Sequence, residues 1–288
     1  MTKAADNREW LDASSGPRRS SPAVILKTRE MTDTLQSIVH AARERVKRAP
    51  GENGLGARAQ AHVPRGFRAA LARVAEHKPA VIAELKKASP SKGLIRAEFS
   101  AAALARELEA SGAAALSVLT DEEHFQGSLQ NLEAASREAR IPCLRKDFIV
   151  HPSQIVESRA HRADAVLLIV AALSDAELRT LKAEAEAESL DVLCEVHDDA
   201  ELRRALTIGF NMIGVNNRDL KTFEVKLDTA FRLAAMIPDG IVRVAESGIA
   251  SAADIRRLRD AGYHAFLIGE SLMKAQHPGG KLKEFLGG

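Results

Sequence analysis

Charged side chains of opposite sign end several short apolar runs, and their spacing suits proton transfer on an anionic substrate. Glu84 and Lys86 close one run two residues apart, so both point to one face of an extended strand. Lys146, Glu195 and Glu246 end three other runs. Lysines held charged by carboxylates can act as acids or bind anions, and carboxylates can act as bases.

Each of these residues also has a simpler interpretation. A single charge at a strand end is usually the start of a solvated loop, and Glu84 and Lys86 could form only a structural ion pair. Inward-facing charges on several strands are harder to explain by packing, because burying an unpaired charge costs several kcal/mol. Taken together, they predict an active site.

Polar and glycine residues follow the same runs and point to a phosphate group. Gly248 and Gly269 leave backbone N–H groups open, and residues 270–274 could begin a short helix, the usual phosphate site of α/β barrels. The predicted substrate is therefore a small phosphorylated anion. The residues that follow the runs are Asn216, Arg218, Ser247, Gly248, Gly269 and Glu270.

The elements that must position these side chains are eight apolar runs alternating with helical stretches. They recur about every 26 residues, the length of one strand, one helix and two short loops. Continuous apolar strands are typical of a parallel sheet covered by helices, and eight such units favour a closed (β/α)₈ TIM barrel. The predicted strands are Ala80–Leu85, Ala114–Leu119, Ile141–Arg145, Ala165–Val170, Asp191–Glu195, Met212–Val215, Ile241–Ala245 and Ala265–Ile268.

The chain before the first strand has a different composition. Residues 1–30 are rich in Ser, Pro and Arg, which predicts a flexible tail. Thr32 or Asp33 is the expected cap of a helix that ends before Pro50, and a second helix is expected over Arg65–Glu76. We therefore predict a helical extension over 31–79 and a catalytic barrel over 80–288.

Composition excludes several classes of protein. A net charge of +2 and 4% aromatic residues argue against nucleic-acid binding. The longest apolar runs are too short for a membrane span, and the charged N-terminus is not a secretory signal. Neither metal-ligand spacing nor a nucleotide-binding loop is present, so we expect no metal and no cofactor. Cys143 and Cys194 lie in apolar runs, which favours free thiols and a cytoplasmic location.

Seven ordered motifs resemble those of the indole-3-glycerol phosphate synthase family. They occupy segments 81–93, 116–121, 125–128, 144–149, 213–220, 245–249 and 267–273. The resemblance implies a (β/α)₈ barrel whose N-terminal helical extension borders the active-site mouth. It also implies the conversion of 1-(2-carboxyphenylamino)-1-deoxyribulose 5-phosphate into indole-3-glycerol phosphate, with release of CO₂ and water, in tryptophan biosynthesis and without a cofactor or metal.

The resemblance further implies roles for four charged residues. Lys146 matches the general acid that protonates the ketone oxygen during ring closure. Glu195 matches the base that helps remove water, and Lys86 matches a second lysine that pairs with anionic groups and assists dehydration. Glu84 would orient both lysines. How Lys146, Lys86 and Glu195 divide closure and dehydration stays open.

The remaining site residues are also carried over by motif. Asn216 and Ser247 would hydrogen-bond the ribulose chain, Arg218 would lie near the substrate carboxylate, and Glu246 is the glutamate of the seventh strand. Phe125 and Phe148 would flank the anthranilate ring, although single aromatic residues can equally be ordinary core. The expected phosphate contacts are Ser89, Gly248, Gly269 and Glu270.

Three alternatives remain. Phosphoribosylanthranilate isomerase, another phosphate-binding barrel, needs a cysteine or aspartate acid–base pair, whereas Cys143 and Cys194 lie inside strands. An inactive binding barrel predicts a broken catalytic set, and this set is intact. A nucleic-acid binder would use a basic helix face at Arg43, Arg45, Lys47 and Arg48. The expected assembly is a monomer with a small-molecule partner.

Overall fold

Eight parallel strands close into a barrel in the computed structural model, which describes residues 1, 22–48, 54–219, 222 and 224–287. The predicted (β/α)₈ fold is confirmed. Each predicted run becomes a strand within about two residues of its expected bounds. The strands are β1 Ala80–Leu85, β4 Ala115–Leu119, β5 Cys143–Lys146, β6 Ala165–Ile169, β7 Asp191–Val196, β8 Met212–Asn216, β9 Val242–Glu246 and β10 Ala265–Ile268.

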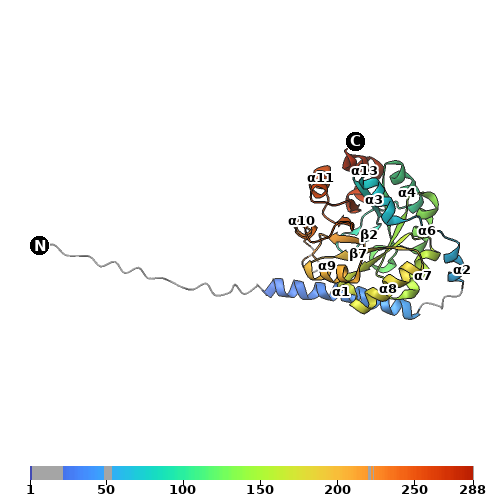
Figure 1. The fold of residues 1–288 in the computed structure, drawn as a ribbon, viewed down its shortest axis with the longest axis horizontal. Helices are drawn as coiled ribbons and strands as arrows, with labels where there is room; N and C mark the ends of the chain where they lie inside the picture. Colours follow the sequence, from blue (N-terminus) through green and yellow to red (C-terminus); the bar gives the residue numbers. More distant parts are fainter. Residues whose placement is uncertain (2–21, 49–53, 220–221, 223, 288) are drawn as a thin grey trace.

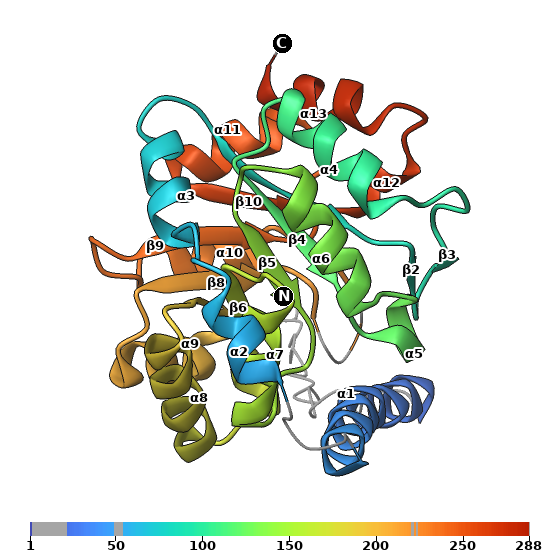
Figure 2. The ribbon, with the colours of Figure 1, turned by 90° about the vertical axis from the view of Figure 1, so that its right-hand side faces the viewer.

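Helices pack around the outside of the barrel (Figure 2). Several begin at an N-cap side chain that accepts a backbone N–H, as Ser174 does from Glu177. Most of the apolar core lies between this ring and the strands, and both cysteines are buried there as free thiols. The covering helices are α4 Ala101–Ala110, α6 Leu129–Glu138, α7 Pro152–Ala160, α8 Asp175–Ala187, α9 Asp199–Ile208, α10 Asp228–Ala234, α11 Ala252–Asp260 and α13 Pro278–Leu286.

Short helices and one hairpin lie in the loops that follow the barrel strands. A two-stranded hairpin follows β1 and pairs Ser89 with Gly93. The predicted helix over residues 270–274 is present directly after β10. These elements are β2 Ala88–Ser89, β3 Gly93–Leu94, α5 Glu122–Phe125, η1 Val170–Ala172 and α12 Glu270–Lys274.

The first helix, α1 (Pro22–Arg48), is longer than predicted. It begins at Pro22 rather than at Thr32 or Asp33, so residues 22–30, expected in the tail, are helical; residues 2–21 lie outside the described part. Proline is favoured at a first helical position, where its missing N–H is not needed. The predicted stop before Pro50 is close to the observed end.

Of the three helices before β1, the first and the third lie at opposite ends of the barrel (Figure 2). α3 (Phe67–Ala75) corresponds to the predicted second helix and packs Phe67 and Leu71 into the inner core, against apolar residues near the strand N-termini. α2 (Leu55–Gln60) packs against α7. α1 runs along the other end, where the strands finish (Figure 1). The barrel is thus closed at the N-terminal ends of its strands by α3 and bordered at their C-terminal ends by α1.

No helix in the described ranges has the length and apolar character that a bilayer crossing needs.

Candidate active site

One cavity opens at the C-terminal ends of the barrel strands, and every site residue expected from the sequence lines it. The register explains this convergence, because the last residues of neighbouring strands pair directly, as Asn216 does with Glu246. The expected residues in the lining are Glu84, Lys86, Ser89, Phe125, Lys146, Phe148, Glu195, Asn216, Arg218, Glu246, Ser247, Gly248, Gly269 and Glu270.

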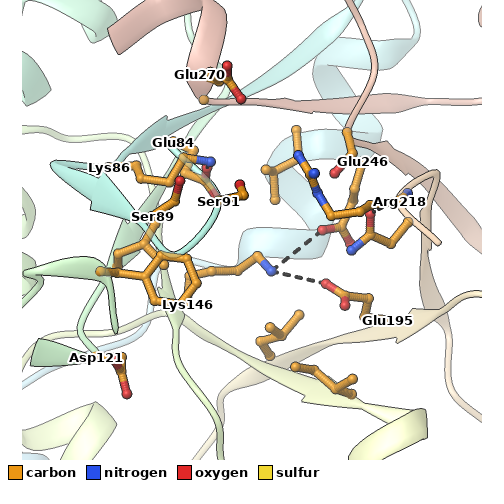
Figure 3. Close-up of a pocket in the computed structure, with 18 of the residues that line it drawn as sticks. Glu84, Lys86, Ser89, Ser91, Asp121, Lys146, Glu195, Arg218, Glu246 and Glu270 are labelled. Carbon is orange, nitrogen blue, oxygen red and sulfur yellow. Dashed lines mark hydrogen bonds and ion pairs between the residues drawn. The ribbon is translucent and has the colours of Figure 1, made fainter. Parts of the chain in front are cut away.

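Lys146, the last residue of β5, lies between two glutamates (Figure 3). Its Nζ is 3.0 Å from Oε2 of Glu195 and 3.7 Å from Oε2 of Glu246. Burial alone would lower the pKa of Lys146, but the carboxylates of Glu195, Glu246 and Glu84 raise it above its usual value. The ammonium is therefore protonated at neutral pH and can serve as an acid.

The two glutamates beside this lysine have opposite pKa shifts. Burial would raise the pKa of Glu195, but Lys146 and His197 lower it well below its usual value. Burial and the adjacent Glu195 charge raise the pKa of Glu246 to about 8, despite Lys146. Such a pair separates into an ionised carboxylate and a neutral acid at pH 7. At neutral pH Glu195 is therefore ionised and Glu246 carries a proton.

Glu84 and Lys86 form a second charged pair in the cavity lining (Figure 3). Lys86 Nζ is 2.6 Å from Oε2 of Glu84, and the two side chains are 18% and 6% exposed. The structural ion pair considered from the sequence is thus present, but it lies in the cavity lining beside Lys146. Lys86 therefore reaches the cavity as a cation held by one carboxylate.

Two glycines, Gly214 on β8 and Gly269 directly after β10, make room for Glu246 and Glu84. A Cβ at Gly214 on β8 would lie 2.1 Å from Oε1 of Glu246, and one at Gly269 would lie 2.2 Å from Oε2 of Glu84. Real Cβ atoms do not approach that closely, so either side chain would displace a carboxyl group. Gly269, expected only as a phosphate contact, is therefore also required by the position of Glu84.

The turn after β9 carries Ser247 in a left-handed conformation. Its φ is 63°, and that of Gly248 is 79°. A left-handed non-glycine residue costs about 1–3 kcal/mol and persists only where its surroundings impose it. Asn217 imposes it here, because its Nδ2 donates to the carbonyls of Glu246 and Ser247 at 3.0 and 3.3 Å. The strained turn aims Ser247 into the cavity lining.

The other part of the cavity is apolar. Phe125 and Phe148 are partly exposed and line it, so neither is an ordinary core residue. β6, whose five residues are all apolar, contributes Leu167 and Ile169. The helix α1 adds Leu35 and Ile38. An aromatic ring can thus be enclosed beside the charged groups.

Sequence reasoning assigned no role to Asp121, Asp147 and Ser91, which also line the cavity. Arg45 of α1 bridges the two aspartates, with Nη1 3.1 Å from Asp121 Oδ2 and Nη2 3.2 Å from Asp147 Oδ1. Arg45, considered above as part of a nucleic-acid surface, therefore fastens the extension to the barrel. All three cavity residues lie inside the motifs that resemble the family, so position next to Lys146 or Ser89 was an available signal.

His197 is a fourth residue to which the sequence assigned no role. His197 follows β7 directly and contacts Glu195, with Nε2 3.3 Å from Oε1. Its position two residues after Glu195 at a strand end was the available signal. In the part of the chain that the structure describes, no group of three or more His, Cys, Asp or Glu side chains is placed to hold a metal ion.

A family model described as indole-3-glycerol phosphate synthase matches residues 35–285. The chain belongs to the indole-3-glycerol phosphate synthase family. A relative of that name from Koribacter versatilis (strain Ellin345) is 60% identical over 260 residues, 89% of this chain and 100% of the relative. Another, from Polaromonas naphthalenivorans (strain CJ2), is 48% identical over 262 residues, with the same two coverages.

Membership of the indole-3-glycerol phosphate synthase family establishes the activity as that of a carboxy-lyase of tryptophan biosynthesis acting on a phosphorylated small molecule. The expected family and function are confirmed, and the isomerase and inactive-barrel alternatives fall away.

Solved structures support the fold alone. A native KDPGal structure is 17% identical with a TM-score of 0.51, covering 72% of this chain and 92% of that one. KGPDC from Streptococcus mutans is 13% identical with a TM-score of 0.54, covering 73% of this chain and 96% of that one.

Proposed function

We propose that this cavity converts 1-(2-carboxyphenylamino)-1-deoxyribulose 5-phosphate into indole-3-glycerol phosphate with Lys146 as the acid of ring closure. The observation that carries the proposal is the position of the Lys146 ammonium between an ionised and a neutral glutamate. As the aryl carbon attacks the ketone, the ketone oxygen becomes an alkoxide and takes a proton from Nζ. Loss of CO₂ then restores the aromatic ring and needs no electron-accepting cofactor.

We assign the dehydration step to Glu195 and Lys86. The Glu195 carboxylate takes the proton whose removal forms the indole double bond, while the hydroxyl takes a proton from the Lys86 ammonium and leaves as water. Lys86, held by Glu84 at 2.6 Å, supplies positive charge to anionic groups and assists this departure. Glu246, whose pKa is raised to about 8, stays protonated and neutral beside Lys146.

Substrate binding divides between the polar and apolar parts of the cavity. We assign the anthranilate ring to the side lined by Phe125 and Phe148, and its carboxylate to Arg218. Asn216 and Ser247 would then meet the ribulose hydroxyls. The phosphate is assigned to four further lining residues, Ser89, Gly248, Gly269 and Glu270.

The wider setting is proposed on the same basis. The barrel over residues 80–288 is the catalytic unit, and the helical segment before it is an extension whose Leu35, Ile38 and Arg45 border the mouth. The enzyme is proposed to act as a monomer that binds no nucleic acid. A cytoplasmic location is supported by Cys143 and Cys194, the two cysteines of the chain, which are both free thiols.

The direct test is incubation of the purified protein with the ribulotide while indole absorbance is followed. We expect indole formation that needs no added metal or cofactor and that persists in a chelator. Absence of any signal between about pH 5 and pH 9 would contradict the proposal.

A further inference from the structure

His197 lies behind Glu195, on the side away from Lys146. Its Nε2 is 3.3 Å from Oε1 of Glu195, whereas Lys146 Nζ is 3.0 Å from Oε2 of the same carboxylate. The imidazole is 8% exposed and is not among the described residues that line the cavity. The Glu195 carboxylate is thus held between two nitrogen groups, and only the lysine faces the substrate.

The start of α9 fixes the imidazole from behind. Oε2 of Glu201 lies 3.0 Å from Nδ1 of His197 and also accepts the backbone N–H of His197 at 2.8 Å. Glu201 is itself placed by Asp198, the N-cap of α9, which accepts the Glu201 N–H at 2.9 Å. The ring therefore cannot turn away from Glu195 without losing its hydrogen bond to Glu201.

The neighbouring carboxylates keep this imidazole charged. Burial would lower the pKa of His197, but contacts with Glu195 and Glu201 raise it to about 10. Both ring nitrogens of an imidazolium carry a proton. Nδ1 is hydrogen-bonded to Glu201, and Nε2 forms an ion pair with Glu195 at 3.3 Å without hydrogen-bond geometry. Lys146, Glu195, His197 and Glu201 thus form a row of alternating charge that runs from the cavity to the helix.

We infer that His197 is a positioning residue that holds Glu195 oriented and ionised from the side opposite Lys146. When Lys146 gives its proton to the substrate, the buried Glu195 carboxylate loses its cationic partner on the cavity side. Glu246 adjoins it and cannot compensate, because it is a second carboxyl group. The imidazolium remains in contact and keeps Glu195 ready to act as a base in the next step.

This inference rests on the proposed role of Glu195, and two substitutions at position 197 test it. Glutamine places its amide nitrogen near the position of Nε2 and keeps a donor toward Glu195. Asparagine places it near Nδ1, toward Glu201, and leaves Glu195 without that donor. The two variants are equally polar and uncharged, so their difference isolates the contact with Glu195.

We expect His197→Asn to lower kcat about tenfold or more, with KM changed less than about twofold, because the residue does not line the cavity. His197→Gln should retain several times the kcat of His197→Asn. Wild-type kcat in His197→Asn, or equal losses in both variants, would overturn the inference. Should His197→Asn fold poorly, its kcat is expressed per folded molecule, and wild-type values for both variants on that basis would overturn the inference equally.

A matched control lies at the opposite end of the barrel. His62 is also buried beside a carboxylate, with Nε2 3.2 Å from Oδ1 of Asp164. His62→Gln should reduce thermal stability and leave kcat unchanged. A loss of kcat in His62→Gln equal to that in His197→Asn would overturn the inference, since any buried histidine would then have the same effect.

A double-mutant cycle with Glu195→Gln separates this inference from the proposed function. If His197 acts through Glu195, His197→Asn causes no further loss of kcat in the Glu195→Gln background. A full tenfold further loss there would overturn the positioning role. Wild-type turnover in Glu195→Gln alone would instead contradict the assignment of Glu195 as the base.

Discussion

Asp164, at the N-terminal end of the barrel, and Glu246, at the C-terminal end, are buried carboxyl groups in very different surroundings. Asp164 is fully buried, and its two oxygens accept from His62, from Arg65 and from the backbone N–H of Cys143. Glu246 is 2% exposed, and its Oε1 has no hydrogen-bond partner among the described residues. Its nearest cation, Lys146, is 3.7 Å away and is shared with Glu195.

This difference separates stability from chemistry within one barrel. Removing one partner of a buried, fully hydrogen-bonded ion pair destabilises the fold, because it leaves the other partner uncompensated. A buried carboxyl group with an unused hydrogen-bonding atom, such as Glu246, can still interact with a bound substrate. In α/β barrels the two ends divide these tasks, with catalytic residues at the C-terminal ends of the strands.

The largest expected effect comes from removing the cation at the mouth. Lys146→Ala should reduce turnover about a thousandfold, because no other described group contacts both Glu195 and Glu246 as a proton donor. The change is measured as the rate of indole-3-glycerol phosphate formation at a saturating concentration of the ribulotide. Lys182→Ala, a lysine on the outer surface of α8, is the control and should keep full activity. A near-wild-type kcat in Lys146→Ala would show that Lys146 is not the acid of ring closure.

At the other end the expected effect is on folding. Asp164→Asn leaves the Arg65 guanidinium without its carboxylate and should lower the free energy of unfolding by about 3 kcal/mol. Urea unfolding followed by circular dichroism measures this change. The kcat of the folded enzyme should stay the same. If the free energy of unfolding were unchanged, the contact between Asp164 and Arg65 would not stabilise the fold.

A smaller effect is expected from the glycine that accommodates Glu246. Gly214→Ala places a Cβ 2.1 Å from Oε1 of Glu246, so the carboxyl group must move and turnover should fall about tenfold. Gly56→Ala is a suitable control, since its Cβ would meet nothing within 4 Å. Steady-state kinetics of both variants provides the comparison. Equal activities would show that the position of Glu246 is unimportant.

The most gradual effect is a pH dependence of the free energy of unfolding. The pKa of Glu246 is raised from 4.5 to about 8 in the folded protein, so its neutral form stabilises the fold fully below pH 4.5. Between pH 4.5 and about 8 the unfolded chain loses this proton while the folded protein keeps it, so stability falls as pH rises. Relative to Glu246→Gln, the wild type should lose at most about 1.4 kcal/mol per pH unit. Parallel stability curves would contradict the raised pKa.

Much of the fold could be predicted because the strands are short runs buried on both faces, which form continuous hydrophobic segments. Ala80–Leu85 and Ala265–Ile268 were predicted at their observed bounds. The hairpin of β2 and β3 could not be, since it has two residues per strand and Gly93 and Leu94 are exposed. The start of α1 was placed too late because Thr32 and Asp33, good capping residues, lie inside a longer helix.

The candidate site was predictable to the extent that it follows from strand ends. Parallel strands bring Lys146, Glu195 and Glu246 together once the barrel closes, so their convergence needs only the topology. The contacts of Arg45 with Asp121 and Asp147 were not predictable, because they join a helix and loops that are distant in sequence. Nor does a sequence reveal which of two adjacent glutamates keeps its proton, since that depends on burial and shared cations.

One pair of isosteric changes tests the division between the two ends most directly. Glu195→Gln and Asp164→Asn each turn a buried carboxylate into an amide, and kcat and the free energy of unfolding are measured on the same preparations. We predict that the two variants differ in kcat. Glu195→Gln loses at least about a hundredfold in kcat, whereas Asp164→Asn loses about 3 kcal/mol of stability and keeps kcat. Parallel losses in both quantities for both variants would contradict the account.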